Sequence, residues 1–331
     1  MPITDMPLEQ LKRYTGSSPC PKDINAFWDE AISEMKAVNA DVELIPANFT
    51  TGFAECFHLY FNGVGGARIY AKYARPAKRH TQLPILLNFH GYRLSSCDWT
   101  GLLPYAAEGF HIAALDCRGQ AGRSSDNAAV TGNTLDGHII RGLADGPASL
   151  YFRSVFLDTA QLAHILTTMP DTDANRIGCF GASQGGALAL ACAALEPRIK
   201  RAAALYPFLC DYRRAWEVGA ESSAYSEIQN WFKTTDPLHE HEEEFFSTLG
   251  YIDVQNIAPR IQARVLMMTG LMDTLCPPST QFATYGKIRS PKEMLVYPDY
   301  GHEDLRLSGD KIFEFMRGLK DGVFSETAHT H

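Results

Sequence analysis

The sequence predicts an α/β fold in which a mostly parallel central sheet is covered by helices on both faces. From residue 85 onward, short apolar segments of strand length alternate with segments of helical periodicity, and this alternation is typical of parallel sheets with crossover helices. The chain has 331 residues, of which 45% are hydrophobic and 21% are charged. These proportions predict a globular protein with a large core, built as a single domain over residues 1–331.

The first 80 residues predict elements that precede the alternating region. Residues 1–50 form a predicted N-terminal helical extension, in which apolar side chains recur at helical spacing over residues 21–38. Two stretches of alternating polarity, 57–61 and 67–74, are joined by Asn62-Gly63-Val64-Gly65-Gly66. A Gly-rich link of this length between two alternating stretches predicts a β-hairpin.

The alternating region supplies the remaining elements. Strands are predicted over the apolar runs 85–89, 111–115, 175–180, 202–206, 265–269 and 294–297, and helices over 102–107, 152–169 and 187–195. Residues 212–258 interrupt this alternation with an aromatic and charged stretch that looks helical. An insertion at this place would lie above the carboxyl ends of the strands, so we expect a cap over the site or an oligomer contact.

Charge and cysteine usage exclude several classes of function. The formal net charge of −8 and the absence of a basic run argue against a nucleic-acid partner. No apolar stretch is long enough to cross a membrane, and the first residues show no signal-peptide pattern. Eight cysteines stand singly at positions 20, 56, 97, 117, 179, 192, 210 and 276. Scattered cysteines of this kind predict reduced thiols and a cytoplasmic location.

A Gly-x-Ser-x-Gly pentapeptide follows the apolar run at 175–180 and precedes the Ala/Leu-rich helix at 187–195. It reads Gly181-Ala182-Ser183-Gln184-Gly185. Between a strand and a helix this motif is the nucleophile elbow of the α/β-hydrolases, where small neighbours allow a sharp turn that exposes the serine hydroxyl. We therefore predict Ser183 as a nucleophile, the alternative being an ordinary strand–helix turn.

A serine nucleophile needs a histidine base and an acid, and in this fold they follow the serine in the order acid, histidine. Asp273 stands just past the predicted strand 265–269, and His302 just past the strand 294–297. We predict these two residues as acid and base. Asp299 is the alternative acid, and His239 and His241 are the alternative histidines, in an acidic stretch that predicts a solvated helix face.

The predicted oxyanion donors are two backbone amides. The amide of Gln184 lies at the N-terminus of the helix after the elbow, and that of Tyr92 lies in the loop after the strand 85–89. The Tyr92 ring is expected to form a wall of the acyl pocket, and His90 to be structural. No cofactor or metal is predicted, since His239-Glu240-His241 lacks the spacing of a zinc helix and no Gly-rich phosphate loop follows the first strand.

Further motifs narrow the prediction to a family. Arg118-Gly119-Gln120 follows the strand 111–115, and Glu303 directly follows His302. Together with the elbow Gly181-Ala182-Ser183-Gln184-Gly185-Gly186, these motifs resemble carbohydrate esterase family seven, the acetyl xylan esterases that also act as cephalosporin-C deacetylases. The resemblance extends over nearly the whole chain, through 8–16, 27–28, 89–92, 270–273 and 277–280.

The resemblance implies the same triad, Ser183, Asp273 and His302, and the same oxyanion amides, Tyr92 and Gln184. It also implies an α/β-hydrolase fold and a homohexamer whose sites face an internal chamber. The chain departs from the family over residues 93–99, where the family pattern leads us to expect a longer and more Gly-rich loop. The resemblance therefore does not predict the residues at the rim of the pocket or the exact substrate. As a hypothesis, Arg118 pairs with Glu303 or another carboxylate and braces the His302 loop, the alternative being an arginine on a surface turn.

The predicted function is two-step hydrolysis of acetyl esters, with acetylated xylo-oligosaccharides and cephalosporin C-type esters as substrates. Ser183, Asp273 and His302 would act through an acyl-enzyme without a cofactor. Two alternatives use the same fold. One is a serine peptidase of the prolyl-oligopeptidase type, and the other is a non-enzymatic interaction protein.

Overall fold

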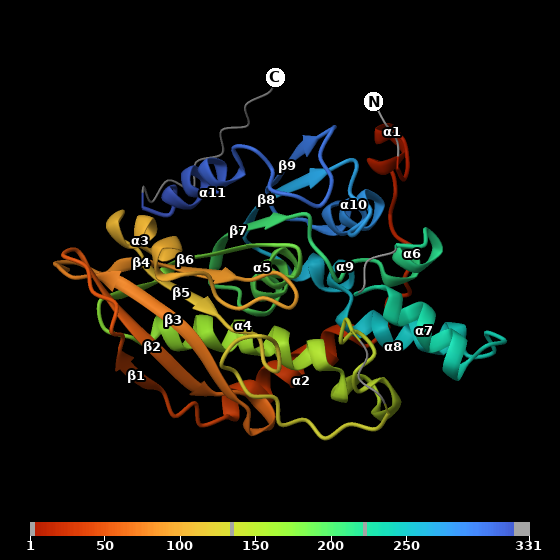
Figure 1. Ribbon diagram of the computed structural model, residues 1–331, viewed down its shortest axis with the longest axis horizontal. Helices are drawn as coiled ribbons and strands as arrows, with labels where there is room; N and C mark the ends of the chain where they lie inside the picture. The colour runs from red at the N-terminus through yellow and green to blue at the C-terminus, as the bar shows by residue number, and fades with distance from the viewer. Residues whose placement is uncertain (1–3, 133–135, 221–223, 321–331) are drawn as a thin grey trace.

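The computed structural model describes residues 4–132, 136–220 and 224–320 (Figure 1). Within them lies one nine-stranded sheet of order β1-β2-β3-β5-β4-β6-β7-β8-β9. Strands β1, β2, β3 and β5 pair antiparallel, and the pairs from β5 through β4 to β9 are all parallel. The predicted α/β fold with a mostly parallel sheet is confirmed. The strands are β1 Glu43–Pro46, β2 Ala54–Asn62, β3 Arg68–Pro76, β4 Leu83–Phe89, β5 His111–Leu115, β6 Thr172–Ala182, β7 Ile199–Leu205, β8 Arg264–Gly270 and β9 Lys292–Tyr297.

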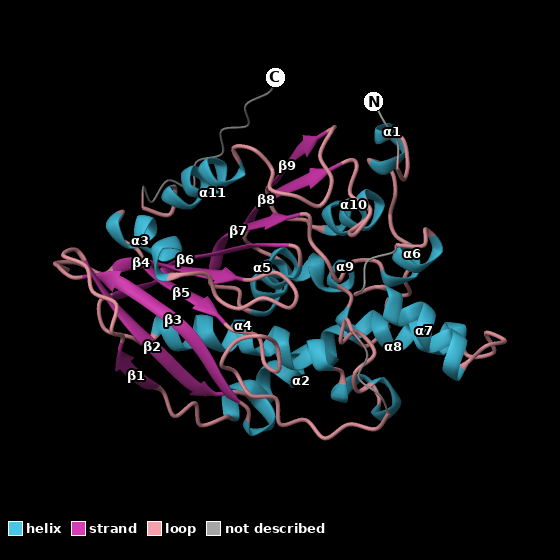
Figure 2. Ribbon diagram, viewed as in Figure 1, coloured by secondary structure: helices cyan, strands magenta, loops and turns pink. Residues whose placement is uncertain are grey.

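Helices cover both faces of the sheet (Figure 2). One face packs against α2 (Ile24–Ala37), α4 (Tyr151–Thr167) and α5 (Gln184–Leu195) in a large apolar cluster that includes Trp28, Phe156 and Leu188. The other face packs against α3 (Trp99–Ala107) and α11 (Ser308–Arg317) in a second cluster. The helix α5 packs against the sheet, against α4 and against α9 (Val254–Ile257), so every one of its residues is buried. Its sequence is accordingly apolar all round.

The predicted hairpin is present as β2 and β3, with a short helical turn at Val64–Gly66 between them. The N-terminal extension contains the predicted helix as α2, and it also contains α1 (Leu8–Leu11) and the strand β1. All four residues of β1 are exposed, so no alternation of buried and exposed positions marks it in the sequence. Two later helices, α10 (Pro278–Lys287) and α11, were also not predicted.

The insertion at 212–258 is helical where it is described. It contains α6 (Tyr212–Glu217), α7 (Ser226–Thr235), α8 (Glu242–Leu249) and α9 (Val254–Ile257). Figure 1 shows α6, α7 and α8 beyond the end of the sheet at which the parallel strands terminate. Across the described ranges, no helix has both the length and the apolar character needed to span a bilayer.

Candidate active site

Ser183 occupies a sharp turn between β6 and α5. Its backbone adopts φ 56° and ψ −121°, a conformation that costs a non-glycine residue free energy and is found at functional sites. A Cβ atom at Gly181 would lie 2.5 Å from the backbone of Gly185, and one at Gly185 would collide with the carbonyl oxygen of Phe89. The two glycines of the motif are therefore required by close backbone approach.

Ser183, His302 and Asp273 form a continuous hydrogen-bonded chain. The imidazole Nε2 of His302 lies 3.0 Å from the Ser183 Oγ, and its Nδ1 lies 2.8 Å from Oδ2 of Asp273. In this arrangement Nδ1–H donates to the carboxylate, and Nε2 is free to accept the serine proton. The structure thus brings together the three residues predicted as nucleophile, base and acid.

Two loops at neighbouring strand ends place the acid and the base. Asp273 follows β8 and His302 follows β9, and the backbone N–H of Met272 donates to the carbonyl of Tyr300 at 2.9 Å. The Asp273 carboxylate is fully buried. Its Oδ1 accepts from the backbone N–H groups of Leu275 and Cys276 at 2.9 and 2.8 Å. These two bonds fix the carboxylate, so that its other oxygen points at the imidazole.

The alternative acid and bases lie elsewhere. Asp299 is exposed, and the bond from His302 goes to Asp273 instead. His239 and His241 are in the insertion, where they approach Glu242 at 3.2 Å and Asp236 at 3.7 Å. Neither is joined to the serine.

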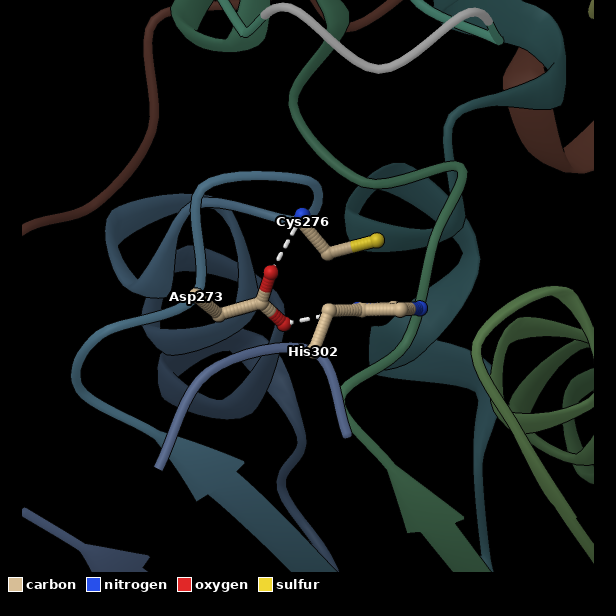
Figure 3. Close-up of side chains that lie close together, drawn as sticks. All are labelled: Asp273, Cys276 and His302. Carbon is tan, nitrogen blue, oxygen red and sulfur yellow. Dashed lines mark hydrogen bonds and ion pairs between the residues drawn. The ribbon is translucent and has the colours of Figure 1, made fainter. Parts of the chain in front are cut away.

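Cys276 completes a close group with Asp273 and His302 (Figure 3). The candidate ligand atoms of the three residues lie within 4.8 Å of one another. Burial and the nearby Asp273 charge raise the pKa of the Cys276 thiol well above its ordinary value, which favours the neutral thiol. The carboxylate and imidazole are also already engaged in the hydrogen-bonded chain. The chemistry of the group therefore fits acid–base catalysis better than metal binding.

A pocket of about 370 Å³ opens at Ser183. Most of its lining is apolar or aromatic. It is lined by Gly91, Tyr92, Arg93, Leu94, Ala182, Ser183, Tyr206, Phe208, Ala224, Leu275, Cys276 and His302. The presence of Ala224 shows that the insertion contributes to this pocket. A space of this kind suits a small acyl group together with part of an alcohol.

The predicted oxyanion donors follow two neighbouring strands of the sheet, β4 and β6. Gln184 is the first residue of α5, and Tyr92 stands in the loop after β4. The Tyr92 ring lines the pocket, as expected, and its hydroxyl lies 2.7 Å from Nδ1 of His138 and accepts from the N–H of Gly137 at 2.6 Å. His90 is buried, and among the described residues its ring bonds to two backbone groups, the N–H of Cys117 and the carbonyl of Gly91. This environment agrees with the structural role expected of His90.

Several pocket residues were missed in the sequence. Tyr206 packs its ring against the His302 imidazole with centroids 4.5 Å apart, and Phe208 lies two residues further on. Both directly follow β7, the strand next to the elbow strand. Their position after a parallel strand is the signal that could have identified them.

Arg118 pairs with another carboxylate, that of Asp158, and not with Glu303. The expected brace on the His302 loop is therefore wrong, and so is the alternative of an arginine on a surface turn, because the side chain is buried. Its guanidinium binds the carboxylate of Asp158 on α4 through two bonds, Nη2 to Oδ1 at 2.6 Å and Nε to Oδ2 at 2.8 Å. It also donates to the carbonyl of Val64. The loop after β5 turns this side chain toward α4 and the hairpin, and the Arg118–Asp158 pair therefore braces that part of the core. Glu303 is exposed and accepts from the N–H of Gly301 in its own loop.

The other two residues of this motif occupy the same loop. Gly119 has φ +64°, a conformation that glycine adopts without strain. The side chain of Gln120 reaches back toward the elbow and contacts Gln184. The predicted supporting residues thus separate into Arg118, which stabilises the core, Gln120, which contacts the site, and Glu303, which stays at the surface.

Two solved structures are similar to this chain over nearly its whole length. The chain is 53% identical to acetyl xylan esterase 1 of Thermoanaerobacterium sp. JW/SL YS485, with a TM-score of 0.93 over 95% of this chain and 99% of that one. It is 37% identical to an acetyl xylan esterase of Paenibacillus sp. R4, with a TM-score of 0.91 over the same shares of the two chains. These likenesses confirm the predicted hydrolase fold.

A curated relative and a family comparison extend the result. The chain is 28% identical over 300 residues to the acetyl esterase Axe7A of Xylanibacter ruminicola, covering 89% of this chain. It spans 65% of the length of that relative. Residues 1–319 match the acetyl xylan esterase family AXE1. The resemblance predicted from the sequence motifs is confirmed, and the chain belongs to the acetyl xylan esterase family.

Proposed function

We propose that this protein is a serine esterase that removes acetyl groups from small acetylated substrates. The observation that carries the proposal is the hydrogen-bonded chain from the buried Asp273 through His302 to Ser183, whose hydroxyl stands at the pocket. A serine hydroxyl becomes nucleophilic when a neighbouring imidazole takes its proton. Family membership and the names of the similar structures support the acetyl ester as the substrate class.

In the first step the Ser183 Oγ attacks the ester carbonyl while its proton passes to Nε2 of His302. The carbonyl π electrons move to the oxygen, which the backbone N–H groups of Tyr92 and Gln184 would stabilise as an oxyanion. The Asp273 carboxylate stabilises the imidazolium that forms. When the tetrahedral intermediate collapses, the C–O bond to the alcohol breaks, and His302 gives its proton to the departing oxygen.

In the second step water takes the place of the alcohol. His302 accepts a proton from the water as it attacks the acetyl-serine, a second oxyanion forms in the same place, and the bond to Ser183 Oγ breaks. The proton returns to Oγ, and acetic acid leaves and loses its remaining acidic proton to solvent. The two steps use the same donors and the same base, so one arrangement serves both halves of the reaction.

A panel of p-nitrophenyl esters from acetyl to octanoyl tests this function, with acetylated xylo-oligosaccharides and cephalosporin C included. We expect the highest kcat/KM for acetyl, because the aromatic residues Tyr92, Tyr206 and Phe208 confine the space beside Ser183. Ser183→Ala should lower kcat on the acetyl ester by several powers of ten. Near wild-type turnover by that variant would contradict the proposed mechanism.

We further propose that the chain forms one domain, acts in the cytoplasm and assembles as a homohexamer. The single sheet that runs from β1 to β9 supports one domain, and the eight free cysteines support a reducing compartment. The hexamer rests on the family resemblance. Light scattering coupled to size exclusion should give a mass six times that of the 36.7 kDa chain, and a monomer would contradict it.

A further inference from the structure

Gln120 lies where the loops of three neighbouring strands meet. Strands β5, β4 and β6 are adjacent and parallel in the sheet, so their carboxyl ends share one edge. The loop after β5 carries Gln120, the loop after β4 carries Tyr92, and the turn after β6 carries Gln184. The two proposed oxyanion donors therefore come from separate loops, and Gln120 stands on the third.

The side chain of Gln120 forms hydrogen bonds to both of the other loops. Its Oε1 accepts from the backbone N–H of Arg93, the residue directly after Tyr92, at 3.2 Å. Its Nε2 donates to Oε1 of Gln184 at 2.8 Å, and the Gln184 Nε2 lies 3.2 Å from the Gln120 Oε1. The two amides thus face each other as a reciprocal pair. A further bond from Nε2 to the hydroxyl of Tyr151, at 3.1 Å, orients the Gln120 amide.

Residues 90–93, which include Tyr92, are held at both ends by the segment of Gln120. At one end the backbone N–H of Cys117 donates to Nε2 of His90 at 3.0 Å. At the other end Gln120 accepts from the N–H of Arg93. The Gln184 side chain is fully buried and also donates toward the carbonyl of His90 at 3.5 Å. The Tyr92 backbone lies between these two fixed points.

We propose that Gln120 is a positioning residue that fixes the two halves of the oxyanion hole relative to each other. This inference rests on the proposed function, because it assigns the backbone N–H groups of Tyr92 and Gln184 as the donors. Gln120 acts through them and touches no reacting atom. An oxyanion hole stabilises the transition state only when its donors are already in place before charge develops, and small displacements of reacting groups lower rates steeply. A tie between the two loops supplies that placement.

Gln120→Met tests the proposal, because methionine has a similar length and forms neither amide bond. We expect kcat on p-nitrophenyl acetate to fall by about tenfold to a hundredfold, with KM nearly unchanged, as for loss of an interaction made in the transition state. The matched control is Gln161→Met. Gln161 is a buried glutamine on α4 whose Nε2 donates to the carbonyl of Asn62 at 2.8 Å. That variant should lower Tm and leave kcat unchanged.

Inhibition by 1,1,1-trifluoroacetone separates positioning from a general loss of structure. The Ser183 Oγ adds to its carbonyl carbon, the π electron pair moves to the oxygen, and the serine proton passes to His302, so the adduct places an oxyanion in the hole. The inhibition constant should rise in Gln120→Met by the factor by which kcat/KM falls. Gln184→Met keeps the backbone donor and removes the other side of the pair. The kcat/KM of the double variant should be no lower than that of the less active single variant.

The outcomes distinguish this inference from the proposed function. If the wild-type protein hydrolyses acetyl esters through Ser183 and Gln120→Met keeps both its kcat and its trifluoroacetone affinity, the inference is overturned and the function stands. If the wild-type protein hydrolyses no ester, the proposed function itself is wrong. Should Gln120→Met not fold, Gln184→Met gives the same test, and unchanged kinetics in it overturn the inference.

Discussion

Arg118 and Asp158 form a doubly hydrogen-bonded ion pair in the protein core. The side chains are 3% and 1% exposed, and the two N–O distances are 2.6 and 2.8 Å. Burial raises the pKa of Asp158, and the Arg118 charge opposes that rise. Such a pair connects the loop after β5 to α4, behind the site rather than in it.

Removal of one partner should therefore be costly. Arg118→Met leaves the Asp158 carboxylate buried without its counter-charge, and we expect the free energy of unfolding to fall by about 3–5 kcal/mol. The double variant Arg118→Met/Asp158→Leu should recover most of that loss, since a buried ion pair can often be replaced by apolar side chains. Urea denaturation of the three proteins measures this. Equal destabilisation of the single and double variants would contradict the account.

The Asp273 carboxylate is expected to act by orienting the imidazole. Asp273→Asn keeps the shape of the side chain but presents an amide to His302, which favours the wrong tautomer. By analogy with the same change in serine proteases, kcat should fall on the order of 10⁴-fold. Steady-state hydrolysis of p-nitrophenyl acetate measures the loss, and Asp299→Asn is the control, because Asp299 is exposed and lies in the same loop as His302. Retained activity in Asp273→Asn together with its loss in Asp299→Asn would reverse the assignment of the acid.

His111 predicts a pH dependence of stability. It is fully buried at the start of β5, with Nδ1 2.5 Å from the hydroxyl of Tyr73. Burial, with the nearby charges of Arg75 and Arg79, lowers its pKa from 6.5 to about 4. The folded state therefore holds the neutral ring. Its contribution to stability is present above pH 6.5 and is lost as the pH falls through about 4.

The expected size of that loss is about 3 kcal/mol between neutral pH and about pH 4, from ~1.36 kcal/mol for each unit of pKa shift. In His111→Gln the fall in unfolding free energy over this range should be smaller by that amount. His80→Gln, at an exposed position, should behave as the wild type. Parallel pH profiles for the wild type and His111→Gln would show that His111 does not titrate as described.

Ester specificity should separate this protein from the peptidases that share its fold. The pocket beside Ser183 has a volume of about 370 Å³ and a largely apolar lining, which suits an acetyl group better than a peptide. We expect ready hydrolysis of p-nitrophenyl acetate and none of peptidyl p-nitroanilides. Efficient cleavage of an anilide would favour the peptidase alternative. Failure of a serine-reactive phosphonate to label Ser183 would favour a non-enzymatic protein.

Much of the fold could be predicted because local patterns agreed with the tertiary structure. The buried parallel strands read as short apolar runs, and the fully buried α5 read as an Ala/Leu segment. The exposed edge strand β1 carried no such pattern and was missed. This strand is specified by its pairing with β2 rather than by its own burial.

The order of the catalytic residues along the chain could be predicted, but the contacts of the residues that surround them could not. Ser183, Asp273 and His302 each follow a recognisable strand, so their convergence could be inferred from topology. The partner of Arg118 could not be predicted, because Asp158 is 40 residues away in the sequence. Which distant residue the loop meets depends on how the helices pack. Asp158 lies within a helix whose sequence reads as core, and only the folded structure shows that its carboxylate meets the guanidinium. The contacts of Gln120 depend in the same way on three loops at once.

The central claim is that Ser183 carries the acetyl group during turnover. Acid quenching of the protein during hydrolysis of p-nitrophenyl acetate, followed by peptide mass mapping, tests it most directly. We predict an acetyl group on the peptide containing Ser183 in the wild type, and none in Ser183→Ala, which should also be inactive. An acetyl group on a different residue, or Ser183→Ala that still turns over the ester at a rate near that of the wild type, would contradict the account.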